Sequence, residues 1–183
     1  SYHFFPSHTR GEGFFLSIVR KRPDDFTPLP LKVPKCQQSD TPPSDVRDWL
    51  SAGEWSFVRS ENLYTAVPRR HEALMNMLRK HLHVLTEGVP LAELRGRDWT
   101  PCHALALNTA LRRGAFPEAE VTYEQAIAYL RREAINVTAP RGYVLVTYHG
   151  LPLGFVKNIG SRANNLYPQE WRIRTTFVPS SQL

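Results

Sequence analysis

The side chains best suited to chemistry gather from residue 141 to the end of the chain. Cationic side chains there can pair with phosphate, and amide side chains can both donate and accept hydrogen bonds. Two aromatic rings offer faces on which an unpaired base can stack. The candidate RNA-binding residues are Lys157, Asn158, Arg162, Asn164, Asn165, Tyr167, Trp171, Arg172 and Arg174. This combination predicts a surface that binds RNA.

A purely structural interpretation of the same residues stays open at this point. Tyr167 and Trp171 are also typical of a protein core, because large rings bury much apolar area. The pair Asn164 and Asn165 suits a turn, since asparagine tolerates the left-handed backbone region. The two interpretations differ in whether these side chains are exposed.

The charge of the chain is uneven along its length. The net charge is +6 and the sequence pI is about 9.6. Residues 1–22 carry a net charge of +3, residues 23–140 carry −1, and residues 141–183 carry +4. A positive field at the two ends favours a polyanionic partner, with a solubilising surface as the alternative.

The sequence gives little support for a metal site or a catalytic nucleophile. Seven histidines are present, but no HExxH or CxxC spacing occurs, so scattered structural histidines are the simpler interpretation. Cys102 and His103 are adjacent, and adjacent helical residues point about 100° apart, which suits a nucleophile–base pair badly. Cys102 is therefore expected to be a small core residue. A free-standing enzyme that uses the histidines is kept only as a minor alternative.

Cofactor, compartment and assembly follow from what the sequence lacks. Gly11 and Gly13 have no third glycine and precede a strand pattern, so no phosphate-binding loop is recognised. Two cysteines without metal spacing, Cys36 and Cys102, suggest free thiols in a reducing compartment, hence the cytoplasm. The apolar runs are too short to span a bilayer. Nothing in the pattern demands more than a monomer.

Secondary structure is expected to change character along the chain. Residues 1–22 contain two β signals around the glycines at 11–13. Residues 23–44 contain six prolines, which predict an extended linker, with a proline-rich SH3 ligand as the alternative. The later elements expected are helices at 44–50, 69–81, 102–113 and 122–133, strands at 55–58, 63–67, 83–85, 89–94 and 172–178, and a hairpin from 142 that turns at 150–152.

Several segments together resemble a known family. Residues 142–157 (GYVLVTYHGLPLGFVK) and 165–172 (NLYPQEWR) are similar to the C-terminal end of Sun/Nop-family, RsmF-like RNA cytosine-5 methyltransferases. Residues 101–106 (PCHALA) and 126–130 (AIAYL) are similar to the accessory region of that family. Residues 5–15 look like the last strands of its catalytic domain. The resemblance covers nearly the whole chain.

The resemblance implies a fold, a domain order and a role. The fold class would be α+β, with a small mixed α/β unit followed by a PUA-like β-barrel. The expected divisions are tail strands of an absent methyltransferase domain at 1–22, the linker at 23–44, a mixed α/β unit that precedes the PUA-like domain at 45–97, and the PUA-like RNA-binding domain at 98–183. The role would be to bind and orient structured RNA, with ribosomal RNA expected, for an S-adenosylmethionine-dependent methyltransferase domain upstream in cis.

Departures from the family pattern limit what is carried over. The S-adenosylmethionine loop and the two catalytic cysteines are missing from these residues. Pro101 and Cys102 do not form the family's Asp-x-Pro-Cys motif, because Trp99 and Thr100 precede them. We therefore expect a non-catalytic part of a longer protein, which also starts at Ser1 rather than methionine, with no cofactor or metal of its own. The alternative is a structural or protein-interaction module that docks on the catalytic domain or on a ribosome-assembly partner.

Overall fold

The structure is a computed structural model that describes residues 2–5, 7, 13–18 and 41–175. The chain divides into two compact units, residues 1–32 and residues 33–183, and each is described by itself. Most of the predicted proline-rich linker, residues 23–40, lies outside the described residues. In the first unit, β1 (Tyr2–Phe4) pairs antiparallel with β2 (Phe14–Leu16), as the two β signals predicted.

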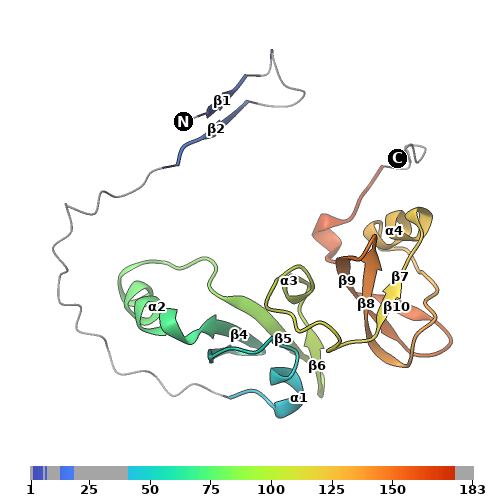
Figure 1. The fold of residues 1–183 in the computed structure, drawn as a ribbon, viewed down its shortest axis with the longest axis horizontal. Helices are drawn as coiled ribbons and strands as arrows, with labels where there is room; N and C mark the ends of the chain where they lie inside the picture. The colour runs from blue at the N-terminus through green and yellow to red at the C-terminus, as the bar shows by residue number, and fades with distance from the viewer. Residues whose placement is uncertain (1, 6, 8–12, 19–40, 176–183) are drawn as a thin grey trace. The chain divides into compact units, whose positions relative to one another are not determined.

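The second unit begins with a four-stranded antiparallel sheet in the order β3-β4-β5-β6 (Figure 1). The strands predicted at 55–58 and 63–67 and the helix predicted at 69–81 are confirmed. Helix α2 starts directly after Pro68, whose fixed φ suits a helix entry. The elements are α1 (Ser44–Arg47), β3 (Trp55–Ser60), β4 (Leu63–Pro68), α2 (Arg69–His81), β5 (Val89–Arg95) and β6 (Asp98–Pro101).

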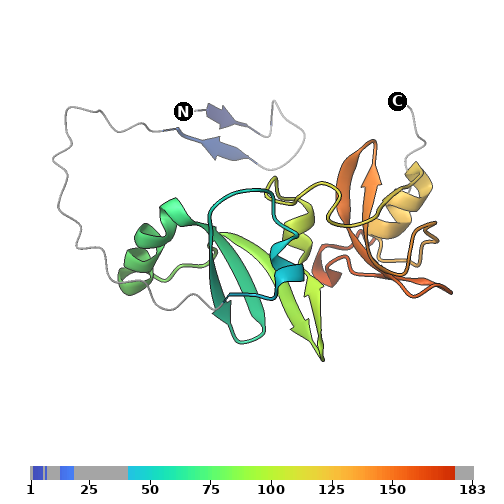
Figure 2. The same ribbon diagram turned by 60° about the horizontal axis from the view of Figure 1, so that its bottom comes forward.

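A second four-stranded sheet follows, in the order β10-β9-β8-β7. Strand β7 pairs parallel with β8, and the other ladders are antiparallel. Helix α4 packs on this sheet (Figure 2), since the buried Tyr129 hydroxyl donates to the Phe155 carbonyl over 3.1 Å. The elements are α3 (His103–Ala106), β7 (Glu118–Glu120), α4 (Tyr123–Leu130), β8 (Gly142–Tyr148), β9 (Leu151–Asn158), β10 (Ala163–Asn165) and the 3-10 turn η2 (Gln169–Trp171).

The β8–β9 hairpin is buried on both faces and joins two apolar cores. Leu145 and Phe155 are cross-strand partners, and both pack into the core of the first sheet. Val144 and Val156 are also partners, and they pack into the core under α4. Successive strand residues point to opposite faces, so one hairpin supplies both cores.

The predicted helix at 102–113 was wrong in its extent. Only α3, residues His103–Ala106, is helical, and residues 98–101 form β6 instead of a helix start. Asn108 ends the helical path, because its Oδ1 atom accepts from the Ala110 amide and builds a turn. The chain then reaches Leu111, which forms a β-bridge with Leu50.

Other predicted boundaries also need correction. Residues 83–85 form no strand, and their loop is held to α2 by a 2.6 Å ion pair between Arg79 and Glu87. Helix α4 starts at the predicted Thr122 capping box but ends at Leu130, shortly before Arg132 with its φ of 65°. Helix α1 spans only four residues. Residues 172–175 join no ladder of the described residues, and residues 176–178 of the predicted last strand lie outside them.

The α+β class is confirmed, and the described ladders form open sheets. In the second sheet β7 and β10 are the edge strands, with one further bridge between Ile135 and Ala163. The predicted domain boundary at residues 97 and 98 falls between β5 and β6, which pair with each other. The predicted domain divisions remain predictions.

Gly154 permits the closest approach in the second core. Its φ is +147°, and a Cβ atom there would collide with the Tyr129 hydroxyl and lie 2.8 Å from His103 Nδ1. We expect Gly154→Ala to lower the free energy of unfolding by roughly 2–4 kcal/mol, through backbone strain and overpacking. Urea unfolding measures this difference.

Gly150→Ala is the matched control for that substitution. Gly150 also has a positive φ, of +71°, but a Cβ atom added there would meet no other atom within 4 Å. It should lose only about 1 kcal/mol, from the backbone conformation alone. Equal losses in the two variants would contradict the proposed clash.

Candidate nucleic-acid interface

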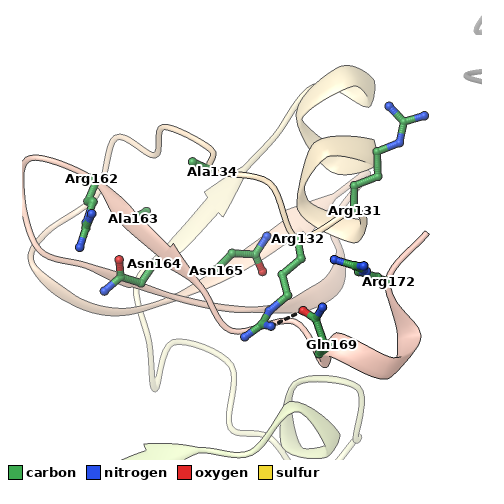
Figure 3. Close-up of a pocket in the computed structure, with 9 residues that line it drawn as sticks. All are labelled: Arg131, Arg132, Ala134, Arg162, Ala163, Asn164, Asn165, Gln169 and Arg172. Atoms are coloured by element: carbon green, nitrogen blue, oxygen red, sulfur yellow. Dashed lines mark hydrogen bonds between the residues drawn. The ribbon is translucent and has the colours of Figure 1, made fainter. Parts of the chain in front are cut away.

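A pocket of about 390 Å³ lies where the end of α4 meets β10 and η2 (Figure 3). We call it the arginine pocket. Its polar lining consists of guanidinium and amide groups, with no carboxylate among them. The polar residues are Arg131, Arg132, Arg162, Asn164, Asn165, Gln169 and Arg172. Clustered guanidinium groups without acids favour binding of an anion, and their planar forks match phosphate oxygens.

Two of these arginines come from the end of α4. Arg132 donates a hydrogen bond from Nη1 to Gln169 Oε1, which fixes its position at the edge of the pocket (Figure 3). Arg131 extends away from Arg132 in that view, and it donates to the Thr175 carbonyl over 2.8 Å. The Nε atom of Arg131 is buried and has no hydrogen-bond partner among the described residues.

The other two arginines come from the C-terminal part of the chain. Arg162 directly precedes β10, which is held by its ladder with β9. Arg172 follows η2, and the next amide, of Ile173, donates to the Leu130 carbonyl over 3.0 Å. This bond brings the C-terminal segment to the end of α4. Neither arginine forms an ion pair with any acid in the described part of the chain.

Asn165 organises the pocket from within. Its side-chain amide donates to the carbonyls of Tyr129 and Glu133, over 2.9 and 3.0 Å. Its Oδ1 atom accepts from the Tyr167 amide over 2.9 Å. The asparagine therefore satisfies carbonyls at the helix end and connects β10 to α4. With its amide engaged in this way, Asn165 shapes the pocket, while Asn164 next to it is exposed.

A smaller neighbouring pocket of about 290 Å³ extends the positive surface. It shares Arg131 and Arg172 with the arginine pocket and adds Arg174. Glu133 is the acid in its lining, so cations outnumber acids there as well. Arg172 and Arg174 therefore lie on one continuous basic surface with Arg131.

Lys157 and Asn158 lie on β9 opposite Asn164 and Ala163, but they line neither the arginine pocket nor its smaller neighbour. The Lys157 ammonium is 3.0 Å from the Asp98 carboxylate and 5.2 Å from the centre of the Tyr143 ring. Its hydrogen bond to Asp98 raises the pKa of Lys157. Asn158 is buried, and its amide donates to the Ala139 carbonyl over 2.7 Å while it accepts from the Gly160 amide. Both residues are engaged in contacts that connect parts of the fold.

The two predicted aromatic residues surround His103. The ring centre of His103 lies 5.1 Å from that of Tyr167 and 5.3 Å from that of Trp171, both edge to face. Tyr167 is half-buried, whereas Trp171 is 57% exposed. Trp171 is thus a surface ring, which suits stacking better than core packing.

Cys102 and His103 do not form a catalytic pair. Burial raises the pKa of the Cys102 thiol to about 12, so the thiol stays protonated and a poor nucleophile at neutral pH. Burial also lowers the pKa of His103, and its Nδ1 atom lacks a hydrogen-bond partner in the described part of the chain. Among the described residues, no group of three or more His, Cys, Asp or Glu side chains could hold a metal ion.

Arg131, Arg132 and Gln169 were missed from the sequence. The segment 23–140 is close to neutral as a whole, which hid the two adjacent arginines. The available signal was a basic pair at the end of a helix, where cations complement the helix dipole. Its partnership with residues 162–172 depends on the fold.

Comparison with known proteins relates the chain to one family of methyltransferases. Residues 116–173 match the family described as the methyltransferase RsmF PUA domain. The chain is RsmF-like. Over 92% of its length it is 30% identical to ribosomal RNA small subunit methyltransferase F of Klebsiella pneumoniae (strain 342) and 31% identical to the protein of that name from Citrobacter koseri. The resemblance predicted from residues 142–157 is thereby confirmed.

The matched region is only part of those relatives. The chain spans 36% of the Klebsiella protein, and it spans 37% of the protein from Escherichia coli O139:H28, to which it is 32% identical over 188 residues. The RsmF-type PUA match covers the arginine pocket, since α4, β10 and η2 all lie within 116–173. In the described residues no helix is long and apolar enough to cross a membrane.

Burial of His103 predicts a pH-dependent stability. Its folded pKa is below the ordinary value, so the unfolded chain binds a proton first as the pH falls. The contribution of the neutral, buried His103 to stability should therefore be fully present above about pH 6.5 and be lost progressively below it. The free energy of unfolding at about pH 7.5 and about pH 5 measures the loss.

His103→Gln should reduce that pH dependence, and His83→Gln is its control because His83 is exposed. The quantity compared is the difference between the free energies of unfolding at the two pH values. A destabilisation by the substitution that is equal at both pH values cancels in this difference. An unchanged difference in His103→Gln would contradict the assignment.

Proposed function

We propose that this chain binds and orients RNA for an S-adenosylmethionine-dependent RNA cytosine-5 methyltransferase, with ribosomal RNA as the substrate. The single observation that carries the proposal is the arginine pocket, which gathers four arginines and no carboxylate in its lining. Phosphate contacts of this kind position a nucleic acid without reading its sequence. The matched relatives are named as small-subunit ribosomal RNA methyltransferases, which supports the choice of substrate.

The proposed arrangement has the chemistry in another part of a longer protein. In this arrangement, residues 98–183 form the PUA-like RNA-binding domain, and its strands close into a β-barrel. Residues 1–22 are the tail of the methyltransferase domain. The longer protein acts in the cytoplasm, as a monomer. The neutral thiol of Cys102 agrees with a chain that performs no methyl transfer itself.

One observation favours a second role as a docking module. Helix α2 has no fully buried residue, and Leu74 on it is 46% exposed. Leu82 and Leu85, which follow the helix, are 61% and 86% exposed. Exposed leucines on this helix and just after it suit contact with a catalytic domain or a ribosome-assembly partner. This role uses a different surface and is compatible with RNA binding.

The RNA-binding proposal is tested by affinity over a salt series. Arg162→Ala with Arg172→Ala should weaken binding to small-subunit ribosomal RNA fragments about tenfold per arginine, as expected for hydrogen bonds to charged groups. The slope of log affinity against log salt should become shallower by roughly 1 for each lost phosphate contact. Fluorescence anisotropy at several salt concentrations measures both quantities.

Arg97→Ala is the control, because it removes one positive charge from an exposed position outside the arginine pocket and its smaller neighbour. It should leave the affinity within about twofold of the unmodified chain. Affinity that does not change with salt, or equal losses in the control and the double variant, would refute the RNA-binding role of the pocket.

The absence of a cofactor site in this chain is a separate proposal. Isothermal titration of the chain with S-adenosylmethionine should release no binding heat, because the family's adenosylmethionine loop does not occur in these residues. A control titration with ribosomal RNA fragments shows that the sample is active. Tight binding of S-adenosylmethionine would contradict the proposal that the cofactor site lies in another part of the longer protein.

A further inference from the structure

A third pocket, of different chemistry, also adjoins the arginine pocket. It has a volume of about 340 Å³ and lies between the β5–β6 hairpin with α3 on one side and the segment 166–170 on the other. We call it the mixed pocket. It shares two residues, Arg132 and Gln169, with the arginine pocket, and these two are hydrogen-bonded to each other (Figure 3). The two pockets are therefore neighbours across a single polar wall.

The mixed pocket is poorly suited to phosphate. Glu93 and Glu170 contribute carboxylates to its lining, and Arg95 is already paired with Glu93 over 2.8 Å. Like charges repel, so a phosphate would gain little there and would prefer the acid-free neighbour. The contrast in charge separates the two pockets into one for an anion and one for an uncharged group.

The mixed pocket offers what a flat, uncharged, hydrogen-bonding group requires. Pro101, Leu166 and Pro168 give it apolar walls, and Tyr167 adds an aromatic ring. Glu170 forms no ion pair with a described residue, so its carboxylate is free to accept from an exocyclic amino group. Its volume is at the small end of ligand pockets, which suits one nucleobase.

We propose that the two pockets together take one unpaired nucleotide of the RNA, with its phosphate in the arginine pocket and its base in the mixed pocket. This inference rests on the proposed RNA-binding function and names the form of RNA that the site selects. Arg132 lies in the wall between phosphate and base and contacts both. A regular duplex keeps its bases stacked inside, so it supplies phosphates to the arginine pocket but no base to the mixed pocket.

Glu170 gives the base pocket a preference. A carboxylate accepts hydrogen bonds and donates none, so it favours adenine, cytosine or guanine, which carry amino groups, over uracil. Trp171, adjacent in sequence and 57% exposed, provides a ring on which the next base along the strand can stack. The site thus selects a bulged or looped nucleotide rather than a helix.

The experiment compares three RNAs that share one duplex of about 20 base pairs. The first is fully paired, the second contains a single bulged adenosine, and the third contains an abasic bulge, which retains the phosphate and lacks the base. The bulged adenosine RNA should bind roughly 5- to 100-fold more tightly than the other two, the range expected for one inserted base. Anisotropy at one fixed salt concentration measures the three affinities.

Two substitutions assign the effect to the two pockets. Glu170→Gln should lower the ratio of adenosine-bulge to abasic-bulge affinity and leave the affinity for the paired duplex unchanged, with Glu124→Gln, exposed on α4, as the control. Arg162→Ala should weaken all three RNAs by a similar factor. Because the three-RNA comparison uses the unmodified chain, it remains decisive even if a variant fails to fold.

The outcomes separate this inference from the function on which it rests. Equal, salt-dependent affinity for all three RNAs would overturn the base pocket and leave RNA binding intact. No measurable affinity for any of them would overturn both. A tighter adenosine bulge whose advantage survives unchanged in Glu170→Gln would overturn the role of Glu170 in recognising the base.

Discussion

The constraint on which the second unit depends is the burial of the β8–β9 hairpin on both faces. Leu145 and Phe155 fill one core while Val144 and Val156 fill the other. A slip of one residue in the register would exchange the two sets and leave neither core complete. Gly154 is part of the same constraint, because only a residue without Cβ lets Tyr129 and His103 approach the strand. Both apolar cores therefore depend on one correctly registered hairpin.

The β8–β9 hairpin positions helix α4, and α4 in turn positions the arginines of the basic surface. Tyr129 anchors the helix to the Phe155 carbonyl, and the helix ends beside β10, where Asn165 binds its last carbonyls. Arg132 therefore projects toward Gln169, and Arg162 approaches from the edge strand. These arginines are positioned by backbone and amide contacts, without carboxylate partners from the described residues. A cation held in this way keeps most of its charge available for a ligand.

Local patterns in the sequence were sufficient for several elements, and they were insufficient for others and for the site. The helix at 69–81, the hairpin from 142 and the Thr122 capping box are determined by nearby residues, and each was predicted. In the overextended helix at 102–113, the apolar residues Leu105, Ala106, Ala110 and Leu111 are indeed buried, but a turn at Asn108 buries them instead. The pairing of Arg131 and Arg132 with residues 162–172 depends on contacts distant in sequence, which no local pattern contains.

The charge of the chain also acquires a different meaning in three dimensions. Counted along the sequence, the positive excess lies at the two ends, yet two arginines of the neutral middle segment complete the pocket. Like charges gathered without acids repel one another and destabilise the folded state. The burial of the two apolar cores offsets that repulsion, and a bound polyanion reduces it. Binding and folding stability are therefore thermodynamically linked at this surface. The same cluster of arginines that lowers the stability of the isolated chain therefore favours binding of an anionic partner.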